Sequence, residues 1–202
     1  MNLTIRLILC AFVVALVGCA NYDRRLTSSS TRYLSSGGEV VTKPSNVGIA
    51  DTVSYWDGDG VSGNPSITIN LGEQKAFFYK GDRLVGVSMI SSGREGYATP
   101  AGTYKVIQKS KDHVSNLYGD YVDGGGNVMV ANVGVKRDPK PPGASFRGAP
   151  MPYFLRFHGG YGLHAGFLPG FPASHGCVRM PERMAQIFFA NSSQGTPVRV
   201  VN

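Results

Sequence analysis

The residues best suited to chemistry lie in one short stretch near the C-terminus, Tyr161–Met180. This stretch contains two of the four histidines, His164 and His175, together with Cys177. A thiolate is a strong nucleophile, but a free thiol is mostly protonated near neutral pH unless a neighbour such as histidine accepts its proton. Gly176 beside the cysteine lets backbone N–H groups face a reacting carbonyl and stabilise an oxyanion. The combination predicts acyl transfer through a cysteine thioester.

Other interpretations of the same side chains remain open. Cys177 taken alone fits a small buried residue, and each histidine fits a hydrogen-bonded loop residue. His164, His175 and Cys177 are also zinc-ligand types. However, the chain has no H-E-x-x-H pattern, and one loop would have to supply all three bonds to the metal. We therefore expect no metal and no other cofactor.

The stretch also resembles a known family. Ser174–Arg179 (SHGCVR) matches the S-H-G-C-[IV]-R signature of the YkuD-type L,D-transpeptidases, and Gly162–His164 (GLH) fits their G-[IL]-H element. Weaker similarities lie in Thr99–Tyr104 (TPAGTY), in the strand pair Ile67–Ile69 and Gln74–Tyr79, and in Gly195–Val198. The resemblance covers about residues 65–201. It implies a mainly β fold with one or two short helices, arranged as a curved β-sandwich or barrel.

The resemblance also implies catalytic roles. Cys177 is expected to be the nucleophile, and His164 the general base and then the general acid. His175 is expected to be a helper that bonds substrate or fixes the loop. The backbone N–H groups of His175, Gly176 and Cys177 are expected to form the oxyanion hole. Ala165 stands where some members have Ser or Gly, so any orientation of His164 from that position must come from the Ala165 carbonyl.

Substrate contacts are implied at three further positions. Ser174, Arg179 and Tyr153 are expected to contact substrate, Arg179 either by holding a carboxylate or by bracing the loop. Residues 151–154 (MPYF) are expected to line the groove for the acyl donor, with Phe154 as a core residue. His113 and His158 have no motif context and are expected to be bystanders. Nine residues separate His164 from Ser174, fewer than in many members, which predicts a tight loop.

The implied activity is transfer of an acyl group from peptidoglycan stem peptides. A terminal D-residue leaves, and an amine takes the acyl group, giving a 3→3 crosslink or attachment of a lipoprotein. Transfer to water, as in an L,D-carboxypeptidase or hydrolase, remains open. So does a wall-binding lipoprotein without catalysis. A papain-like enzyme is disfavoured because its cysteine precedes its histidine in the chain, whereas His164 comes first here.

The N-terminus indicates export. Arg6 precedes an apolar run, Leu7–Val17, which is too short to span a bilayer and is typical of a signal peptide. Leu16–Cys19 (LVGC) resembles a bacterial lipobox, which implies a lipoprotein signal peptide at residues 1–18 and lipidation of Cys19. Ala20 after the cysteine favours the outer membrane. The expected location is the periplasmic face of a membrane, held by a lipid anchor.

Composition limits the class of protein and its partners. Hydrophobic residues make up 42% of the 202 residues and charged residues 16%, which excludes a charge-rich disordered chain. The net charge is +7 with scattered basic residues, which suits an acidic wall polymer or anionic lipid. No basic cluster indicates nucleic-acid binding.

The elements that must position the site follow from local patterns. Polar residues between 19 and 64 predict a flexible tether, on which Tyr55 and Trp56 are suited to dock on the domain. Residues 65–202 form the predicted catalytic domain. Its expected helix is Pro181–Ala190, with a stripe of Met184, Ile187 and Phe188. The expected strands are Ser66–Leu71, Lys75–Tyr79, Arg83–Ser91, Gly102–Gln108, Asn127–Asn132, Tyr153–Phe157, Tyr161–His164 and Thr196–Val201.

Overall fold

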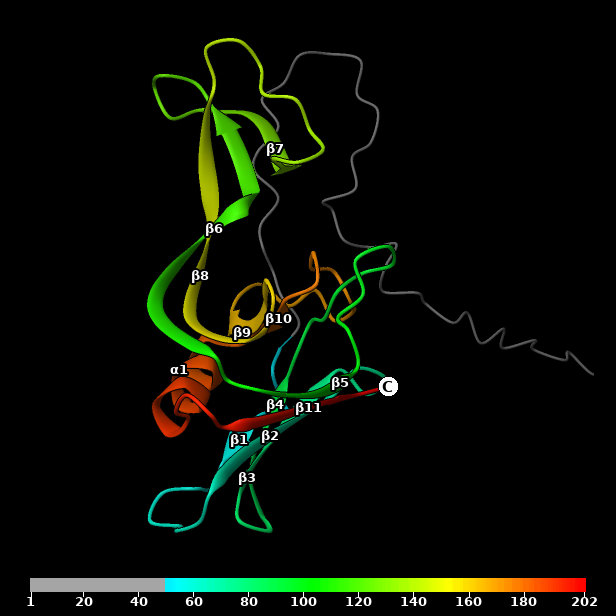
Figure 1. The fold of residues 1–202 in the computed structure, drawn as a ribbon, viewed down its shortest axis with the longest axis vertical. Coiled ribbons are helices and arrows are strands. Elements are labelled where there is room, and N and C mark those ends of the chain that lie inside the picture. Colours follow the sequence, from blue (N-terminus) through cyan, green and yellow to red (C-terminus); the bar gives the residue numbers. More distant parts are fainter. Residues whose placement is uncertain (1–49) are drawn as a thin grey trace, which may run out of the picture. The chain divides into compact units, whose positions relative to one another are not determined.

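The computed structural model describes residues 50–202, which fold into two mixed β-sheets and one α-helix (Figure 1). The expectation of a mainly β fold with a short helix is confirmed. The predicted signal peptide, lipidation of Cys19 and most of the tether lie outside the described residues and stay predictions. Within residues 50–202, no helix is long and apolar enough to cross a membrane.

The first sheet holds the N- and C-terminal strands of the described chain. Its order is β1-β4-β3-β2-β11-β5. The strands are β1 (Tyr55–Trp56), β2 (Pro65–Asn70), β3 (Lys75–Lys80), β4 (Arg83–Met89), β5 (Gly102–Lys105) and β11 (Pro197–Val201). Strands β2, β3 and β4, which match three of the predicted strands, form an antiparallel meander. Strand β11 closes the chain parallel to β2 and antiparallel to β5.

The second sheet carries the chemically interesting stretch. Its order is β10-β9-β8-β6-β7. The strands are β6 (Gln108–Val122), β7 (Val128–Gly134), β8 (Ser145–His158), β9 (Tyr161–Ala165) and β10 (Val178–Met180). The long strands β6 and β8 pair antiparallel and extend away from the first sheet, with β7 at the far end (Figure 1).

The main core joins both sheets to the helix. Helix α1 (Glu182–Asn191) buries Met184, Ala185 and Phe188, close to the predicted stripe. The same core cluster includes Ile67 and Ile69 of β2, Leu163 of β9, and Val178 and Met180 of β10. The fully buried Phe78 meets Trp56 and Phe188 edge to face, with ring centroids 5.4 and 5.0 Å apart. Helix packing therefore supports the strands that carry the site.

Several elements differ from the predicted ones. No strand was predicted between Gln108 and Asn127, where the structure has β6, and β8 begins at Ser145 rather than Tyr153. The first half of β6 has no fully buried residue, so it lacks the apolar alternation that identifies a strand. Strands β1 and β10 were not predicted at all. Strand β1 lies inside the expected tether, where Trp56 packs on the core.

An interruption in β6 shapes the space above the site. The pairing of β6 with β8 shifts register between Val114 and Gly119. At this point a Cβ on Gly148 would lie 2.0 Å from the Ser115 carbonyl oxygen, so only glycine allows the approach. The Ser115 hydroxyl accepts a hydrogen bond from the Tyr118 N–H (2.9 Å). This interruption of β6 thus holds Tyr118 in place, and Tyr118 is one of the residues of the site described below.

We expect Phe78→Ala to lower the free energy of unfolding by about 3–5 kcal/mol, because it leaves a cavity between Trp56 and Phe188. The matched control is Phe171→Ala. Phe171 is 60% exposed, so the same truncation should change stability by no more than about 0.5 kcal/mol. Urea denaturation of both variants measures the difference. Equal effects would contradict this description of the core.

Candidate active site

Parallel pairing of two short strands sets the distance between the histidine and the cysteine segments. Val178 of β10 lies opposite Leu163 of β9, and Arg179 lies opposite His164. On its other side, Arg179 exchanges both backbone hydrogen bonds with Ser91, at 2.9 and 3.0 Å. Cys177 immediately precedes β10 and is therefore held beside the start of β9.

The turn that carries the cysteine is braced by side chains. The Ser174 hydroxyl accepts a hydrogen bond from the Gly176 N–H (3.0 Å) and donates one to the Cys177 carbonyl. The Thr99 hydroxyl donates to the Gly176 carbonyl (2.7 Å). Gly176 has a φ of 112°, and a Cβ there would lie 2.5 Å from the Tyr161 ring, so glycine is required. Ser174, expected to contact substrate, lines the neighbouring cavity and also holds the turn together.

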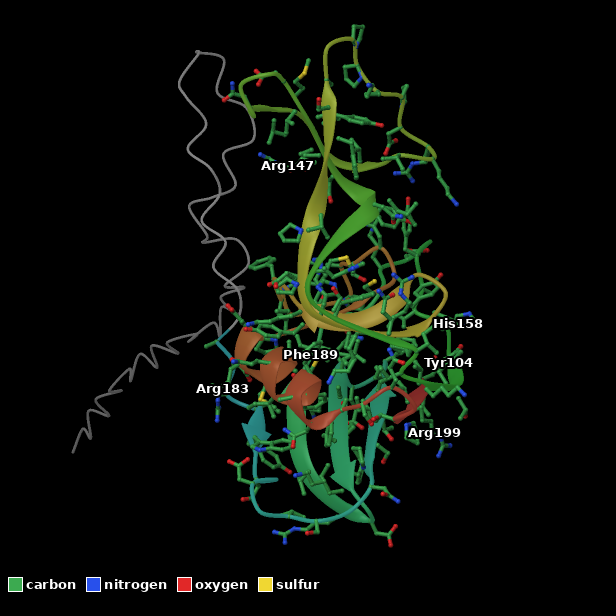
Figure 2. All side chains as sticks on the ribbon, turned by 60° about the vertical axis from the view of Figure 1, so that its left-hand side comes forward. Tyr104, Arg147, His158, Arg183, Phe189 and Arg199 are labelled. Atoms are coloured by element: carbon green, nitrogen blue, oxygen red, sulfur yellow. The ribbon has the colours of Figure 1, made fainter. Side chains whose placement is uncertain are left out.

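A cavity of about 930 Å³ opens beside this turn. Cys177, His164 and Arg179 line it together with the interrupted part of β6 and the facing part of β8. Arg147, on the extended β6–β8 hairpin (Figure 2), lines the outer end. A volume of this size accommodates a short peptide segment or a drug-sized molecule.

His164 is buried and its tautomer is fixed by the backbone. Its side chain is 6% exposed, and Nδ1 lies 2.8 Å from the Ala165 carbonyl oxygen. A carbonyl only accepts, so Nδ1 carries the hydrogen and Nε2 keeps its lone pair. Burial lowers the pKa of His164 to about 4, with Arg179 acting in the same direction. His164 is therefore a neutral base at physiological pH, oriented by the carbonyl expected from the sequence.

Cys177 rests as a protonated thiol. Its Sγ donates weakly to the Gly160 carbonyl at 3.5 Å. Burial raises the thiol pKa above its ordinary value, although the Gly162 N–H and the charges of Arg156 and Arg179 pull it down. A preformed thiolate–imidazolium pair is thus not the resting state. A role as nucleophile would require the thiol to lose this proton first.

His175 is enclosed by other side chains. Arg94 donates from a terminal nitrogen to His175 Nε2 (2.9 Å), so this nitrogen accepts and Nδ1 carries the hydrogen. The Tyr118 ring stacks on the imidazole at 4.4 Å, and Tyr97 meets it edge to face at 4.8 Å. Burial, with the charge of Arg94, lowers the pKa of His175 to about 4. These contacts fit the loop-fixing role among the two expected for His175.

The three N–H groups expected to form the oxyanion hole are not equivalent. The Gly176 N–H is already bound to the Ser174 hydroxyl. Among residues 50–202, the N–H groups of His175 and Cys177 donate to no protein acceptor. Two of the three predicted donors are therefore free for a ligand, and the Gly176 donor is not.

Other predicted positions fall outside the cavity. Tyr153, expected to contact substrate, does not line it and instead packs on Phe189 of α1, with centroids 5.9 Å apart. Phe154 is fully buried, as expected of a core residue. The His158 ring lies beside that of Tyr104, with centroids 4.8 Å apart and the rings tilted by 31°, and both residues are labelled in Figure 2. Of the groove segment 151–154, Met151 alone faces the cavity.

The sequence patterns did not identify some residues that lie in the site. His113, expected to be a bystander, lines the cavity and stacks on Phe154 with centroids 4.3 Å apart. Arg156 lines the cavity, and Arg94 and Tyr118 hold His175. These residues come from strands and loops distant in sequence, so no local motif marks them. The bulky aromatic and basic types alone were too common to single out.

The zinc alternative has no geometric support in the described chain. Within residues 50–202, no three His, Cys, Asp or Glu side chains come together in a way that could hold a metal ion. His164 and His175 each direct one ring nitrogen to a protein partner, Ala165 and Arg94.

Comparison with known proteins places this arrangement in a family. The family model YkuD, the L,D-transpeptidase catalytic domain, matches residues 64–200. The chain belongs to this family. The "Probable L,D-transpeptidase YbiS" of Escherichia coli strain K12 is 26% identical over 176 residues, which are 84% of this chain and 52% of that protein. The chain thus spans about half the length of the curated relatives it matches.

Solved L,D-transpeptidases share the fold of the described domain. The enzyme from Mycobacterium smegmatis has a TM-score of 0.53 at 16% identity, covering 69% of this chain and 59% of its own. An L,D-transpeptidase in complex with imipenem has a TM-score of 0.52 at 16% identity, covering 68% and 58%. The enzyme from Stackebrandtia nassauensis has a TM-score of 0.50 at 22% identity, covering 69% and 56%.

The raised pKa of Cys177 has a measurable consequence. We expect its alkylation by iodoacetamide to be slow at pH 7 and to rise with pH beyond the ordinary thiol value, because only the thiolate reacts. Mass spectrometry of the peptide containing Cys177 gives the rate at each pH. Small free thiols serve as the reference. A rate that is already high and flat between pH 5 and 8 would show a preformed thiolate and contradict the neutral resting state.

Proposed function

We propose that this protein is an L,D-transpeptidase that acts on peptidoglycan stem peptides through a thioester at Cys177. The observation that carries the proposal is the hydrogen bond from His164 Nδ1 to the Ala165 carbonyl. It leaves Nε2 as the proton-accepting atom of a neutral imidazole, in the same cavity as the thiol. Base, nucleophile and free N–H donors together form the set needed for acyl transfer.

The first half-reaction forms the acyl-enzyme. His164 Nε2 takes the proton from Cys177 Sγ, and the sulfur attacks the carbonyl carbon of the amide that follows an L-centre. The N–H groups of His175 and Cys177 stabilise the oxyanion. As the C–N bond breaks, His164 returns the proton to the departing amine of the terminal D-residue. A thioester remains on Cys177.

The second half-reaction resolves the thioester. An acceptor amine attacks the thioester carbonyl, His164 takes a proton from the amine, and the C–S bond breaks. His164 then gives that proton to the Cys177 sulfur, which restores the resting enzyme. An amine on a second stem peptide gives a 3→3 crosslink, and a lysine of a lipoprotein gives attachment. Water as acceptor gives L,D-carboxypeptidase activity.

The site of action follows from the predicted N-terminal features. A lipid on Cys19 would hold the domain at the periplasmic face of a membrane, with the outer membrane favoured. Residues from 20 to about 50 would then provide reach towards the wall. The net charge of +7 suits an acidic wall polymer as the nearby surface. A wall-binding lipoprotein without catalysis would share these features. Only an experiment whose outcome depends on the Cys177 thiol distinguishes the two functions.

A carbapenem tests the acylation step. We expect imipenem, which a solved relative of the same fold binds, to add its full mass to the Cys177 peptide, because ring opening loses no atoms. Cys177→Ala should abolish the adduct. His164→Gln should keep the fold and slow acylation by about 10²–10⁴ through loss of the base. Intact-mass and peptide mass spectrometry measure both effects.

Tetrapeptide muropeptides test the natural reaction. Loss of the terminal D-residue and appearance of crosslinked product should both disappear in Cys177→Ala. Turnover that survives in Cys177→Ala would exclude covalent thiol catalysis. Acylation by imipenem without turnover of any muropeptide would leave the thiol chemistry in place but contradict the proposed substrate class.

A further inference from the structure

Arg94 holds the peptide unit that carries one of the two free N–H donors. Its backbone N–H donates to the Ser174 carbonyl (3.1 Å). That carbonyl and the His175 N–H belong to one planar trans peptide, in which the two groups point in opposite directions. The bond to the carbonyl therefore turns the His175 N–H away from the Arg94 backbone.

The Arg94 side chain holds the imidazole of the same residue. A terminal nitrogen donates to His175 Nε2 (2.9 Å). The guanidinium lies over the Tyr97 ring at 4.6 Å, and Tyr97 in turn meets the imidazole edge to face. Within residues 50–202, Arg94 forms no ion pair with a carboxylate. The imidazole and the Tyr97 ring are thus the partners that hold this guanidinium.

Arg94 lies behind the turn rather than in the cavity. Among the described residues, the cavity lining includes His175 and Cys177 but not Arg94. The arginines whose charges lower the pKa of the Cys177 thiol are Arg156 and Arg179. Any effect of Arg94 on a reaction at Cys177 must therefore pass through the turn.

We propose that Arg94 is a positioning residue for the oxyanion hole, which holds the His175 ring and peptide so that the His175 N–H meets the oxyanion formed at Cys177. This inference rests on the proposed function, because it requires acyl transfer at Cys177. A donor stabilises an oxyanion most when it is already aimed at the place where charge develops. Two bonds, one to the imidazole and one to the peptide carbonyl, restrict the rotations that would turn this donor away.

Two reagents that react with the same sulfur test the proposal. With p-nitrophenyl acetate, the thiolate adds to the ester carbonyl, an oxyanion forms, and nitrophenolate leaves as the C–O bond breaks. With iodoacetamide, the thiolate displaces iodide directly and no oxyanion forms. We expect Arg94→Met to slow acylation about 10- to 100-fold and to change alkylation by less than about twofold. Nitrophenolate release and mass spectrometry of the Cys177 peptide give the two rates, with Cys177→Ala as the blank.

Arg137→Met is the matched control. The Arg137 guanidinium also lies over the Tyr97 ring, at 5.7 Å. Its side-chain hydrogen bonds in the described chain go to Tyr97 and Asp138 rather than to the turn. Removing this charge should therefore leave both rates unchanged. Arg94→Lys, which keeps a donor and the charge, should restore part of the acylation rate.

A double-mutant cycle tests whether Arg94 acts through His175. In a His175→Ala background, Arg94→Met should slow acylation much less than it does in the wild type, because the imidazole that Arg94 holds is gone. Thermal unfolding checks that each variant is folded. Fully additive effects of the two substitutions would contradict the proposal.

Nitrogen-15 NMR of the wild-type His175 ring, assigned with His175→Ala, tests the contact without any Arg94 variant. We expect an unprotonated Nε2 and a protonated Nδ1. A proton on Nε2 would exclude Arg94 as its donor and overturn the proposal, even if Arg94→Met does not fold.

The remaining outcomes separate this proposal from the proposed function. Unchanged acylation in Arg94→Met, or an equal loss of acylation and alkylation, would reduce Arg94 to a brace of the loop. A wild type that p-nitrophenyl acetate acylates at Cys177, but that reacts with neither imipenem nor muropeptides, would contradict the proposed function. The ratio of acylation to alkylation would then still decide the role of Arg94. A wild type that p-nitrophenyl acetate does not acylate would contradict both.

Discussion

The parallel pairing of β9 with β10 is the constraint on which the site depends. It puts Arg179 opposite His164 and so fixes where the chain must turn before Val178. A slip of one residue would reverse the faces of the side chains on one strand. Ser91 bonds the free edge of β10, and Thr99 holds the carbonyl of the turn. Segments far apart in the chain therefore determine the position of one sulfur atom.

Burial and charge oppose each other at that sulfur. Two arginines favour the thiolate, but burial outweighs them, and the pKa of Cys177 is raised. The same burial lowers the pKa of His164 to about 4. The resting site thus holds a neutral thiol and a neutral imidazole. In the proposed reaction, charge develops when a substrate fills the cavity, where preorganised donors stabilise it most strongly.

The sequence predicted the parts of this site better than their contacts. Short motifs singled out Cys177 and His164, which the structure brings to one cavity. The absence of a side-chain hydroxyl at Ala165 predicted the carbonyl contact that His164 makes. Strand β6 escaped prediction because it borders a cavity and shows no apolar alternation. The contact of Arg94 with His175 joins residues separated by 81 positions. Likewise, the capture of the Gly176 N–H by a serine hydroxyl depends on turn geometry, which residue spacing does not encode.

The central claim is that the Ala165 carbonyl holds His164 as a neutral, Nδ1-protonated base. Nitrogen-15 NMR of the histidine rings at pH 7 tests it most directly, with the His164→Gln protein assigning the signals among the four histidines. We predict a protonated Nδ1 and an unprotonated Nε2 for His164, unchanged down to about pH 5. An imidazolium ring, or a proton on Nε2 of the neutral ring, would contradict the account.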